Sequence, residues 1–497
     1  GRYPGFANES VINVGQWLFD APAGKHGYVQ PTADGSLQFA DGTPARFWGT
    51  TLCYGATFPE KPAEIIKLAD AIAAMGYNLV RLHHNDLPWN GIGYLQQKPP
   101  SNYLLEPSHM ERMDKLVAEL FKRGIYVYMD LIDSRNLLEE DGLDVPDFEK
   151  LKKLNGGGWK GLFPHPAIVK AWKRSATELL NHVNPYTNRK WADEPGIVTI
   201  EIINENGLFW DWNFKLTDSM TDWHNQQWNQ WLLKRYGSRE KLDAAWTDVN
   251  GTHGLFANED PAKNTVFSPR LMPFLDWDRP YRSKTRGAAR VNDYFAYLSQ
   301  TAGGFYRDAT QHLRSLGYKG LVIGSHELYG PANQHAEVQD GRALAAHLYA
   351  NGSTVFNARP GVTGAELEGV DLRVNNWFSN IPRVKVQGVP AINGEWTGGT
   401  FTRRADVNMA VATISSYQNI SQSLQFSLAH RWRGEQMPNV DFLYRYIGYK
   451  KKIDRSFSSL HDIPWQSVNR VIAPMFIRQD ISRPQVRVHL ACSAADR

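Results

Sequence analysis

One stretch of the chain decides the fold, and it reads Ile197-Val198-Thr199-Ile200-Glu201-Ile202-Ile203-Asn204-Glu205-Asn206. Six of the seven residues from 197 to 203 are strand formers, and polar residues follow them at once. A short apolar run that ends in this way is typical of a buried parallel strand with a functional loop at its carboxyl end. The stretch therefore predicts one strand of an α/β domain.

Similar apolar runs recur on both sides of this stretch, between about residues 46 and 430, and they alternate with segments of helical period. The seven further predicted strands are 47–52, 78–82, 125–131, 320–323, 344–349, 389–393 and 424–428. No G-x-G-x-x-G turn follows an early strand, which argues against an open doubly wound sheet. Eight strand and helix units favour a (β/α)8 TIM barrel.

The segments outside the regular repeat are predicted to decorate this barrel, which spans residues 46–465. Residues 206–318 separate the fourth and fifth strands, which is too long for a plain connection. We expect helices there at 223–236 and 291–316, from their apolar stripes.

The two ends of the chain are each assigned a β structure. Within residues 1–45, the runs 28–30 and 37–39 flank Asp34-Gly35 and predict a β-hairpin that closes the bottom of the barrel. Residues 466–497 contain the strand-like runs 468–472 and 485–488, which predict a β-like tail or the start of a small appendage.

Composition and charge exclude several classes of protein. The 497 residues carry 55 Lys and Arg against 51 Asp and Glu, and both signs are scattered, so we expect no nucleic-acid partner. No apolar run approaches the roughly 18 residues of a membrane helix, so we expect no membrane partner. The two cysteines lie far apart and form no metal-binding pattern. We expect a monomer without cofactor, secreted or periplasmic, although the chain begins without a signal peptide.

Two carboxylates follow predicted strands on opposite sides of the barrel mouth. Glu205 follows the fourth strand and Glu395 follows the seventh, where a barrel places its working residues. Two carboxylates about 5 to 5.5 Å apart are what a retaining glycosidase needs. Asn204 is able to donate its amide to a sugar hydroxyl. Glu327, after the fifth strand, is the rival partner of Glu205 if the strands are misnumbered, and a solvated loop acid is the ordinary alternative for any single Glu.

These motifs resemble those of the clan A glycoside hydrolases, most closely the cellulase-like family 5. The resemblance rests on 200–206 and on Ile392-Asn393-Gly394-Glu395-Trp396, and it covers roughly residues 28–435. It extends to Phe47-Trp48-Gly49, to Gly76-Tyr77-Asn78-Leu79-Val80-Arg81-Leu82-His83-His84 and to His347-Leu348-Tyr349.

The resemblance implies a role for several individual residues. Glu205 takes the place of the family's acid/base and Glu395 that of its nucleophile. Arg81 takes the place of the arginine that holds the nucleophile, although a buried arginine that pairs with any barrel acid is also possible. His347 is implied beside the acid/base, and the Tyr349 hydroxyl is implied to bond the nucleophile.

Further residues are candidates for sugar contacts. His83 and His84 follow one another on a strand, so only one of them is expected to face the cleft. Trp396 and Trp432 offer stacking faces for sugar rings. No H-E-x-x-H or comparable spacing is present, so we expect no metal.

The sequence thus predicts a retaining β-glycoside hydrolase that acts on a polysaccharide or oligosaccharide, with β-glucan and β-mannan favoured. The alternatives are an exo-acting enzyme on galactose-based or algal glycans, a transglycosylase, and an inactive carbohydrate-binding barrel. Endo or exo action stays open, because the long segment 206–318 is able either to border a groove or to block it.

Overall fold

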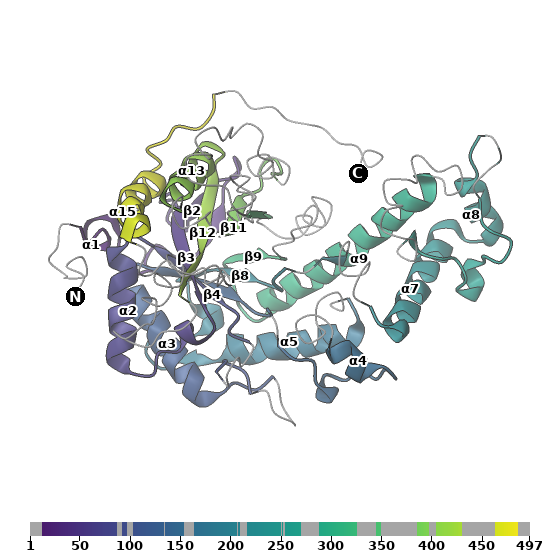
Figure 1. Ribbon diagram of the computed structural model, residues 1–497, viewed down its shortest axis with the longest axis horizontal. Coiled ribbons are helices and arrows are strands. Elements are labelled where there is room, and N and C mark those ends of the chain that lie inside the picture. The colour runs from purple at the N-terminus through teal and green to yellow at the C-terminus, as the bar shows by residue number, and fades with distance from the viewer. Residues whose placement is uncertain are drawn as a thin grey trace, which may run out of the picture.

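The structure is a computed structural model, and it describes residues 12–86, 92–96, 103–133, 135–153, 164–205, 207–208, 216–249, 251, 254–269, 288–325, 344–348, 385–396, 404–429 and 463–485. The centre of the molecule is a parallel sheet with helices packed around it (Figure 1). None of the helices in these ranges combines the length and the apolar character that crossing a membrane requires.

In the described part of the chain the sheet has eight parallel strands, and each predicted strand corresponds to one of them. They are β3 (Phe47–Cys53), β4 (Leu79–His83), β5 (Tyr126–Asp130), β8 (Ile197–Glu201), β9 (Leu321–Ile323), β10 (Leu344–Leu348), β11 (Ala391–Trp396) and β12 (Ile420–Ala429). Their order in the sheet is β10-β11-β12-β3-β4-β5-β8-β9. The last strand in the chain therefore pairs with the first, as in a barrel and not as in an open doubly wound sheet.

Side-chain contacts across the interior show that the sheet curls on itself. Thr199 of β8 and Gln422 of β12 share a hydrogen bond of 3.0 Å, although three strands lie between β8 and β12 in the sheet order. A flat sheet would hold these strands far apart, because neighbouring strands are spaced about 4.8 Å. The predicted parallel α/β fold is confirmed, and the curled sheet is consistent with the predicted TIM barrel, with β9 and β10 as the two edge strands of the described sheet.

Helices follow the strands along the chain and cover the outside of the sheet (Figure 1). The principal ones are α2 (Pro62–Ala74), α3 (Pro107–Lys122), α5 (Pro166–Asn181), α13 (Arg404–Tyr417) and α15 (Ile463–Ile477). In α2 the predicted apolar face is buried, with Ile65, Leu68 and Ile72 inside. The helix stops before Gly76, whose φ of 90° suits glycine and ends the helical path.

The remaining short elements lie in the connections between the main strands and helices. They are α1 (Gly15–Leu18), η2 (Tyr54–Thr57), η3 (Glu139–Asp141), α4 (Phe148–Lys152), β6 (Val183–Asn184), β7 (Arg189–Lys190) and η5 (Trp191–Asp193).

The amino-terminal hairpin closes one end of the barrel. Strands β1 (Val29–Pro31) and β2 (Leu37–Phe39) are antiparallel, as predicted. Their buried side chains form one apolar cluster with residues at the beginnings of the barrel strands, among them Phe47, Leu79 and Tyr126. Two residues after Leu79 on β4 comes Arg81, so the barrel interior changes from apolar at this end to charged toward the other.

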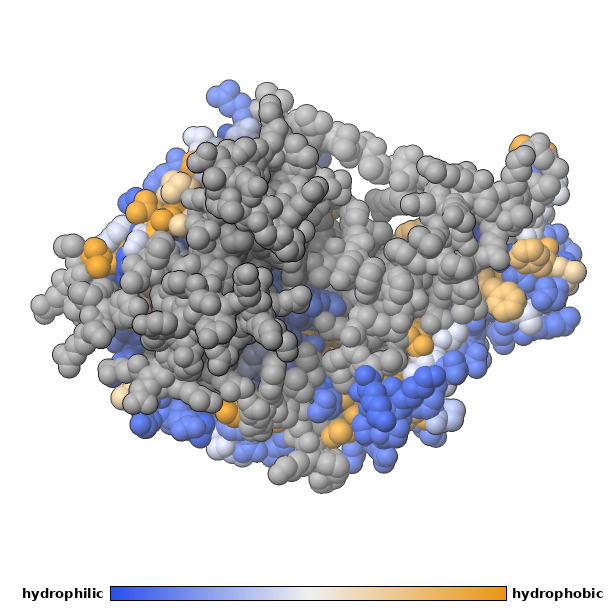
Figure 2. Space-filling view, viewed as in Figure 1, coloured by the Kyte–Doolittle hydropathy of each residue, from blue (hydrophilic) through white to orange (hydrophobic). Residues whose placement is uncertain are grey.

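Among the described residues between β8 and β9 are four helical elements that extend away from the barrel (Figure 1). These are α7 (Asp218–Tyr236), α8 (Arg239–Trp246), η6 (Pro261–Lys263) and α9 (Ala288–Ser315), here called the helical lobe. The two predicted long helices correspond to α7 and α9. The lobe has an aromatic core in which Trp228 packs against Trp231, Trp246 and Tyr294. Its outer end is mostly hydrophilic, with isolated apolar side chains (Figure 2).

One expectation about the carboxyl end was wrong. Residues 468–472 form no strand, because they belong to α15. Trp465, Ile472 and Phe476 are buried at helical spacing, and α15 packs on α13 and β3. A short apolar run does not by itself distinguish a strand from a buried helix. Here the spacing of the buried residues over the whole segment is that of a helix. Of the other predicted strand, 485–488, only Gln485 lies within the described residues.

Candidate active site

Arg81 is the centre of the site. Its side chain is fully buried on β4 and donates hydrogen bonds to the side chains of four residues and to the Gly394 carbonyl. Nε donates to Asp130 Oδ1 at 3.0 Å, and Nη1 donates to Glu395 Oε2 at 2.7 Å. Nη2 donates both to Glu201 Oε2 and to Asn204 Oδ1, each at 2.8 Å. The guanidinium therefore ties β4 to β5, β8 and β11 inside the barrel.

The buried acids around Arg81 outnumber the nearby cations. Arg81 and His83 face Asp130, Asp133, Glu201 and Glu395. Burial of uncompensated negative charge is costly, so part of this excess is removed by protonation.

Glu201 is the group of this cluster whose pKa is shifted strongly toward the protonated form. Burial raises the pKa of Glu201 well above its usual value, and the negative charge of Asp130 adds to this against the opposing effect of Arg81. The Glu201 carboxyl hydrogen bonds to Asp130 and accepts from the Tyr128 hydroxyl at 3.1 Å. Asp130 stays ionised, because Arg81 and His83 overcome its burial and hold its pKa below the usual range.

His83 forms the second positive centre. Its Nδ1 pairs with Asp130 and, at 2.9 Å, with Asp133 Oδ1. Burial and the charge of Arg81 would lower the pKa of His83, but Asp133 and Asp130 outweigh them and raise it to about 9. Burial and the charge of Asp130 raise the pKa of Asp133 to about 7. The Nε2 atom of His83 lies 3.7 Å from Glu395 Oε2, so a protonated His83 adds positive potential beside that carboxylate.

Glu395 lies inside β11 and not after it, since the strand runs on to Trp396. Only 5% of Glu395 is exposed, and its contacts with Arg81 and His83 direct it to the barrel interior. Neighbouring side chains on a strand point to opposite faces, so Trp396 points outward. It is fully buried between Trp48 and Trp465, with ring centroids 5.6 Å away on each side. The predicted sugar contact of Trp396 was therefore wrong.

Asn204 and Glu205 lie in the turn that follows β8. Asn204 is buried, accepts from Arg81, and donates its backbone N–H to the Ile132 carbonyl at 2.8 Å. Glu205 is half-buried and has a φ of 46°, in the left-handed region that a side chain other than glycine seldom adopts. Such strained backbone is concentrated at functional sites, where the surrounding structure holds it. Arg81 and Asn204 therefore anchor the backbone immediately before Glu205.

His84 faces a different environment from His83. It is half-buried, has a φ of 53°, and stacks on Tyr54 with 4.8 Å between ring centroids. Its backbone N–H donates to Asp133 Oδ2 at 2.7 Å. Donor atoms of His83, His84 and Asp133 lie within 4.8 Å of one another, which is a spacing that suits a metal ion. The sequence spacing did not predict this cluster, because Asp133 follows a different strand. His83 already pairs with Asp133 as an ion pair.

The other predicted residues are placed in part or not at all. His347 lies on β10, and its backbone is in register with Glu395 on β11. Tyr349 and Trp432 lie outside the described residues, and so does the rival carboxylate Glu327.

Three residues of the buried cluster were missed by the sequence analysis. Glu201 and Asp130 fall within predicted strands to which no functional role was assigned, and Asp133 was not considered. The signal that could have found them is the alternation of side chains between the two faces of a strand. Tyr128 and Asp130 share one face of β5, as Arg81 and His83 do on β4, so acids and bases at these positions had to meet inside a barrel.

Comparisons with known sequences identify no relative. No protein-family model matches the chain, and no curated protein matches it.

Solved structures are similar to the chain at low sequence identity. A glycoside hydrolase family 5 mannosidase from Rhizomucor miehei is 9% identical, with 91% of this chain and 98% of that chain covered and a TM-score of 0.53. An endo-1,4-β-mannanase from the same organism is 13% identical, with 81% and 91% covered and a TM-score of 0.47. A β-glucanase from Saccharophagus degradans is 11% identical, with 92% and 97% covered and a TM-score of 0.40. The chain thus has the fold of the family 5 mannosidase.

Proposed function

We propose that this protein is a retaining β-glycoside hydrolase, with Glu395 as nucleophile and Glu205 as general acid and base. The fold that it shares with the family 5 mannosidase supports the proposal, since active sites of such barrels lie at the carboxyl ends of the strands. Glu395 is near the end of β11, and Glu205 follows β8 by four residues.

The observation that carries the proposal is the bond of 2.7 Å from Arg81 Nη1 to Glu395 Oε2. A charge-assisted bond of this kind is short and directional, so it fixes the orientation of the carboxylate. Because Arg81 is itself held by Asp130 and Glu201, the nucleophile is set against a rigid, buried partner. Positioning of this kind accounts for a large part of enzymatic rate acceleration.

The reaction proceeds by two displacements at the anomeric carbon. In the first, a carboxylate oxygen of Glu395 bonds to the anomeric carbon, the glycosidic C–O bond breaks, and Glu205 gives its proton to the leaving oxygen. In the second, Glu205 takes a proton from water, the water oxygen bonds to the same carbon, and the bond to Glu395 breaks. The product keeps the β configuration and both carboxyl groups return to their starting states.

The proposed substrate is a β-linked polysaccharide or oligosaccharide, with β-mannan and β-glucan favoured. The protein that supplies the fold comparison is named a mannosidase, and a structure of one of its mutants contains mannosyl-fructose. Galactose-based and algal glycans are the alternatives. For such substrates, a secreted or periplasmic location is the one that we propose. A panel of these polysaccharides, with reducing ends as the readout, would identify the substrate.

Covalent labelling tests the mechanism directly. A 2-fluoro glycosyl fluoride of the matching sugar slows the second displacement, so the glycosyl-enzyme accumulates. Digestion and mass spectrometry should then find the added mass on the peptide that contains Glu395, and Glu395→Gln should take up no label. A label on Glu327, or hydrolysis with inverted configuration, would contradict the assignment.

A further inference from the structure

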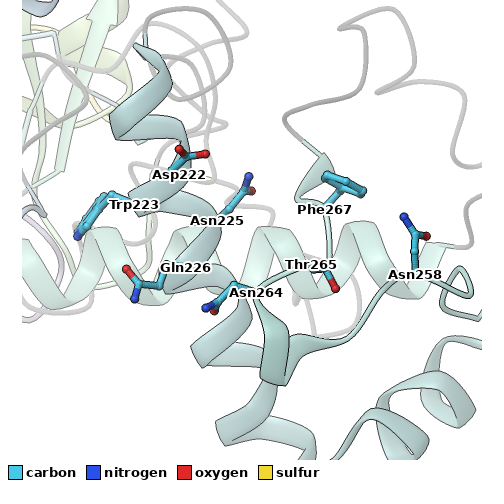
Figure 3. Close-up of a pocket in the computed structure, with 8 residues that line it drawn as sticks. All are labelled: Asp222, Trp223, Asn225, Gln226, Asn258, Asn264, Thr265 and Phe267. Carbon is cyan, nitrogen blue, oxygen red and sulfur yellow. The ribbon is translucent and has the colours of Figure 1, made fainter. Parts of the chain in front are cut away.

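The helical lobe has a pocket of about 730 Å³ on its surface, separate from the cluster around Arg81. This volume lies within the range of roughly 300 to 1,000 Å³ that is usual for ligand sites. Helix α7 contributes one side and the segment 258–267 contributes the other (Figure 3). Its lining, here called the lobe pocket, consists of Asp222, Trp223, Asn225, Gln226, Asn258, Asn264, Thr265 and Phe267.

We propose that the lobe pocket binds a neutral, β-linked glycan chain as a second carbohydrate site. Four of its eight lining residues carry amides, one carries a hydroxyl, and two are aromatic. Amides both donate and accept hydrogen bonds, as neighbouring sugar hydroxyls do. Aromatic rings pack on the C–H faces of sugar rings.

The same lining argues against other ligands. None of the eight described lining residues is basic, so a phosphate or another anion would find no positive charge. Asp222 is the single carboxylate among them, which is too few for a hard metal ion. An apolar ligand would have to remove water from the four amides without replacing their hydrogen bonds.

One polar atom in the pocket has unused hydrogen-bonding capacity. The side-chain oxygen of Asn225 is buried and has no hydrogen-bond partner among the described residues. An amide oxygen in this state costs free energy unless a ligand or water donates to it. In Figure 3 it projects from α7 toward the segment that carries Phe267. The oxygen is covered in this structure, so a sugar hydroxyl would reach it once the Asn225 side chain turns into the pocket.

The pocket is also built rigidly, which favours binding because little ordering is needed. Asn229 of α7 exchanges two hydrogen bonds of 3.0 Å with the backbone of Val266. Glu259 is fully buried, pairs with Arg290 through both oxygens, and accepts from the backbone N–H of Phe267 at 3.2 Å. These contacts leave Phe267 47% exposed on a fixed backbone.

The placement of the rings indicates an extended ligand. Trp223 on α7 and Phe267 on the facing segment are set apart along the pocket, with Asn225, Gln226 and Asn264 between them and Asn258 beyond Phe267 (Figure 3). One sugar ring stacks on one of them, so a chain of several units is needed to use both. This inference rests on the proposed function only for the class of glycan. Binding in the lobe pocket does not require hydrolysis at Glu395.

Affinity electrophoresis in gels that contain soluble β-mannan or β-glucan tests the proposal. The parent protein is Glu395→Gln, so that the polymer is not hydrolysed during the run. We expect the parent to be retarded in one of these gels, and Phe267→Ala to weaken that binding about three- to tenfold. The matched control is Phe256→Ala, since Phe256 is also 47% exposed on the lobe but does not line the pocket. It should be retarded as the parent is.

A second variant covers the case in which Phe267→Ala fails to fold. The double variant combines Asn225→Ala with Gln226→Ala. The Asn225 side-chain oxygen has no partner among the described residues, and Gln226 is exposed, so the melting temperature should stay nearly unchanged. Retardation in the gel should still be weaker than that of the parent. In otherwise wild-type protein, the same variant should raise KM for the polymer and leave KM for a short aryl glycoside unaltered.

Two results would overturn the proposal. One is the absence of retardation of the parent in every gel, and the other is equal retardation of the pocket variants and Phe256→Ala. Failure of the proposed function looks different, because the wild-type protein would then bind polymer without releasing sugar.

Discussion

Arg81 Nη1 lies 2.7 Å from Glu395 Oε2, and this bond joins β4 to β11 across the barrel interior. In the sheet order, β12 and β3 separate these two strands. The contact therefore exists only because the sheet curls on itself. It places the proposed nucleophile against a cation that is 314 residues away in the chain.

Removal of either proposed catalytic carboxylate should have a distinct kinetic pattern. Glu205→Gln should lower kcat/KM about 10²- to 10⁴-fold for natural glycosides, which need a proton on the leaving oxygen. For a 2,4-dinitrophenyl glycoside, whose leaving group needs no proton, the loss in the first step should be much smaller. Glu395→Gln should be inactive on both substrates, as steady-state assays of each will show. If Glu205→Gln lost as much kcat/KM on the 2,4-dinitrophenyl glycoside as on natural glycosides, Glu205 would not be the general acid.

Replacement of Arg81 by lysine should impair catalysis. Lysine keeps the charge but lacks the planar fork that holds Glu395 and Glu201 together. Misplacement of a reacting group by about 1 Å is able to cost about 100-fold in rate, so kcat/KM should fall by at least this order. The control is Arg135→Lys, a second buried arginine, which pairs with Asp141. If both variants lose activity equally, the effect is on folding and not on the nucleophile.

Replacement of the carboxyl group by an amide should leave the protein stable at Glu201 but destabilise it at Asp130. Because the pKa of Glu201 is raised well above its usual value, Glu201→Gln replaces one neutral group by another of the same shape. Its free energy of unfolding should stay within about 1 kcal/mol of the wild type. Asp130→Asn removes an ionised partner of both Arg81 and His83 and should cost about 3 kcal/mol or more. Urea unfolding at pH 7 compares them, and an equal loss would show that Glu201 is ionised.

The ion pairs of His83 should make stability depend on pH. The pKa of His83 is raised from 6.5 to about 9, so its contribution is fully present below pH 6.5 and is lost as the pH rises through 9. For a shift of this size the contribution is about 3 kcal/mol. The difference in unfolding free energy between wild type and His83→Gln should therefore shrink between pH 6 and pH 10. A difference that does not change with pH would mean that His83 is neutral throughout.

Trp396 should matter for packing and not for sugar binding. Trp396→Ala leaves a cavity between Trp48 and Trp465 and should lower the free energy of unfolding by about 3 to 5 kcal/mol. Trp465→Ala opens the same cluster from α15, away from Glu395, and should cost a similar amount. Denaturant titration of the two variants provides the comparison. If Trp396→Ala is nearly as stable as the wild type but raises KM strongly, the original expectation of a sugar platform would be restored.

Local patterns were sufficient for the regular parts of the fold. The eight strands, the hairpin and the two long lobe helices follow from periodicity over a few residues, because each buries one face in the same way along its length. The prediction of secondary structure failed where the hydrophobic pattern covered only a few residues. Residues 468–472 looked like a strand and are helical, and Trp396 looked like a loop residue and lies within β11.

By itself, the sequence determined which residues form strands and which acids end near their carboxyl ends, because burial of apolar faces is a local requirement. Only the tertiary structure decided how the charges meet. Arg81, Asp130, Glu201 and Glu395 come from four strands, and the curling of the sheet brings the three acids within hydrogen-bond distance of the Arg81 guanidinium. Their protonation states depend on that shared burial, and no single segment contains the information because each charge is set by its neighbours from the other strands.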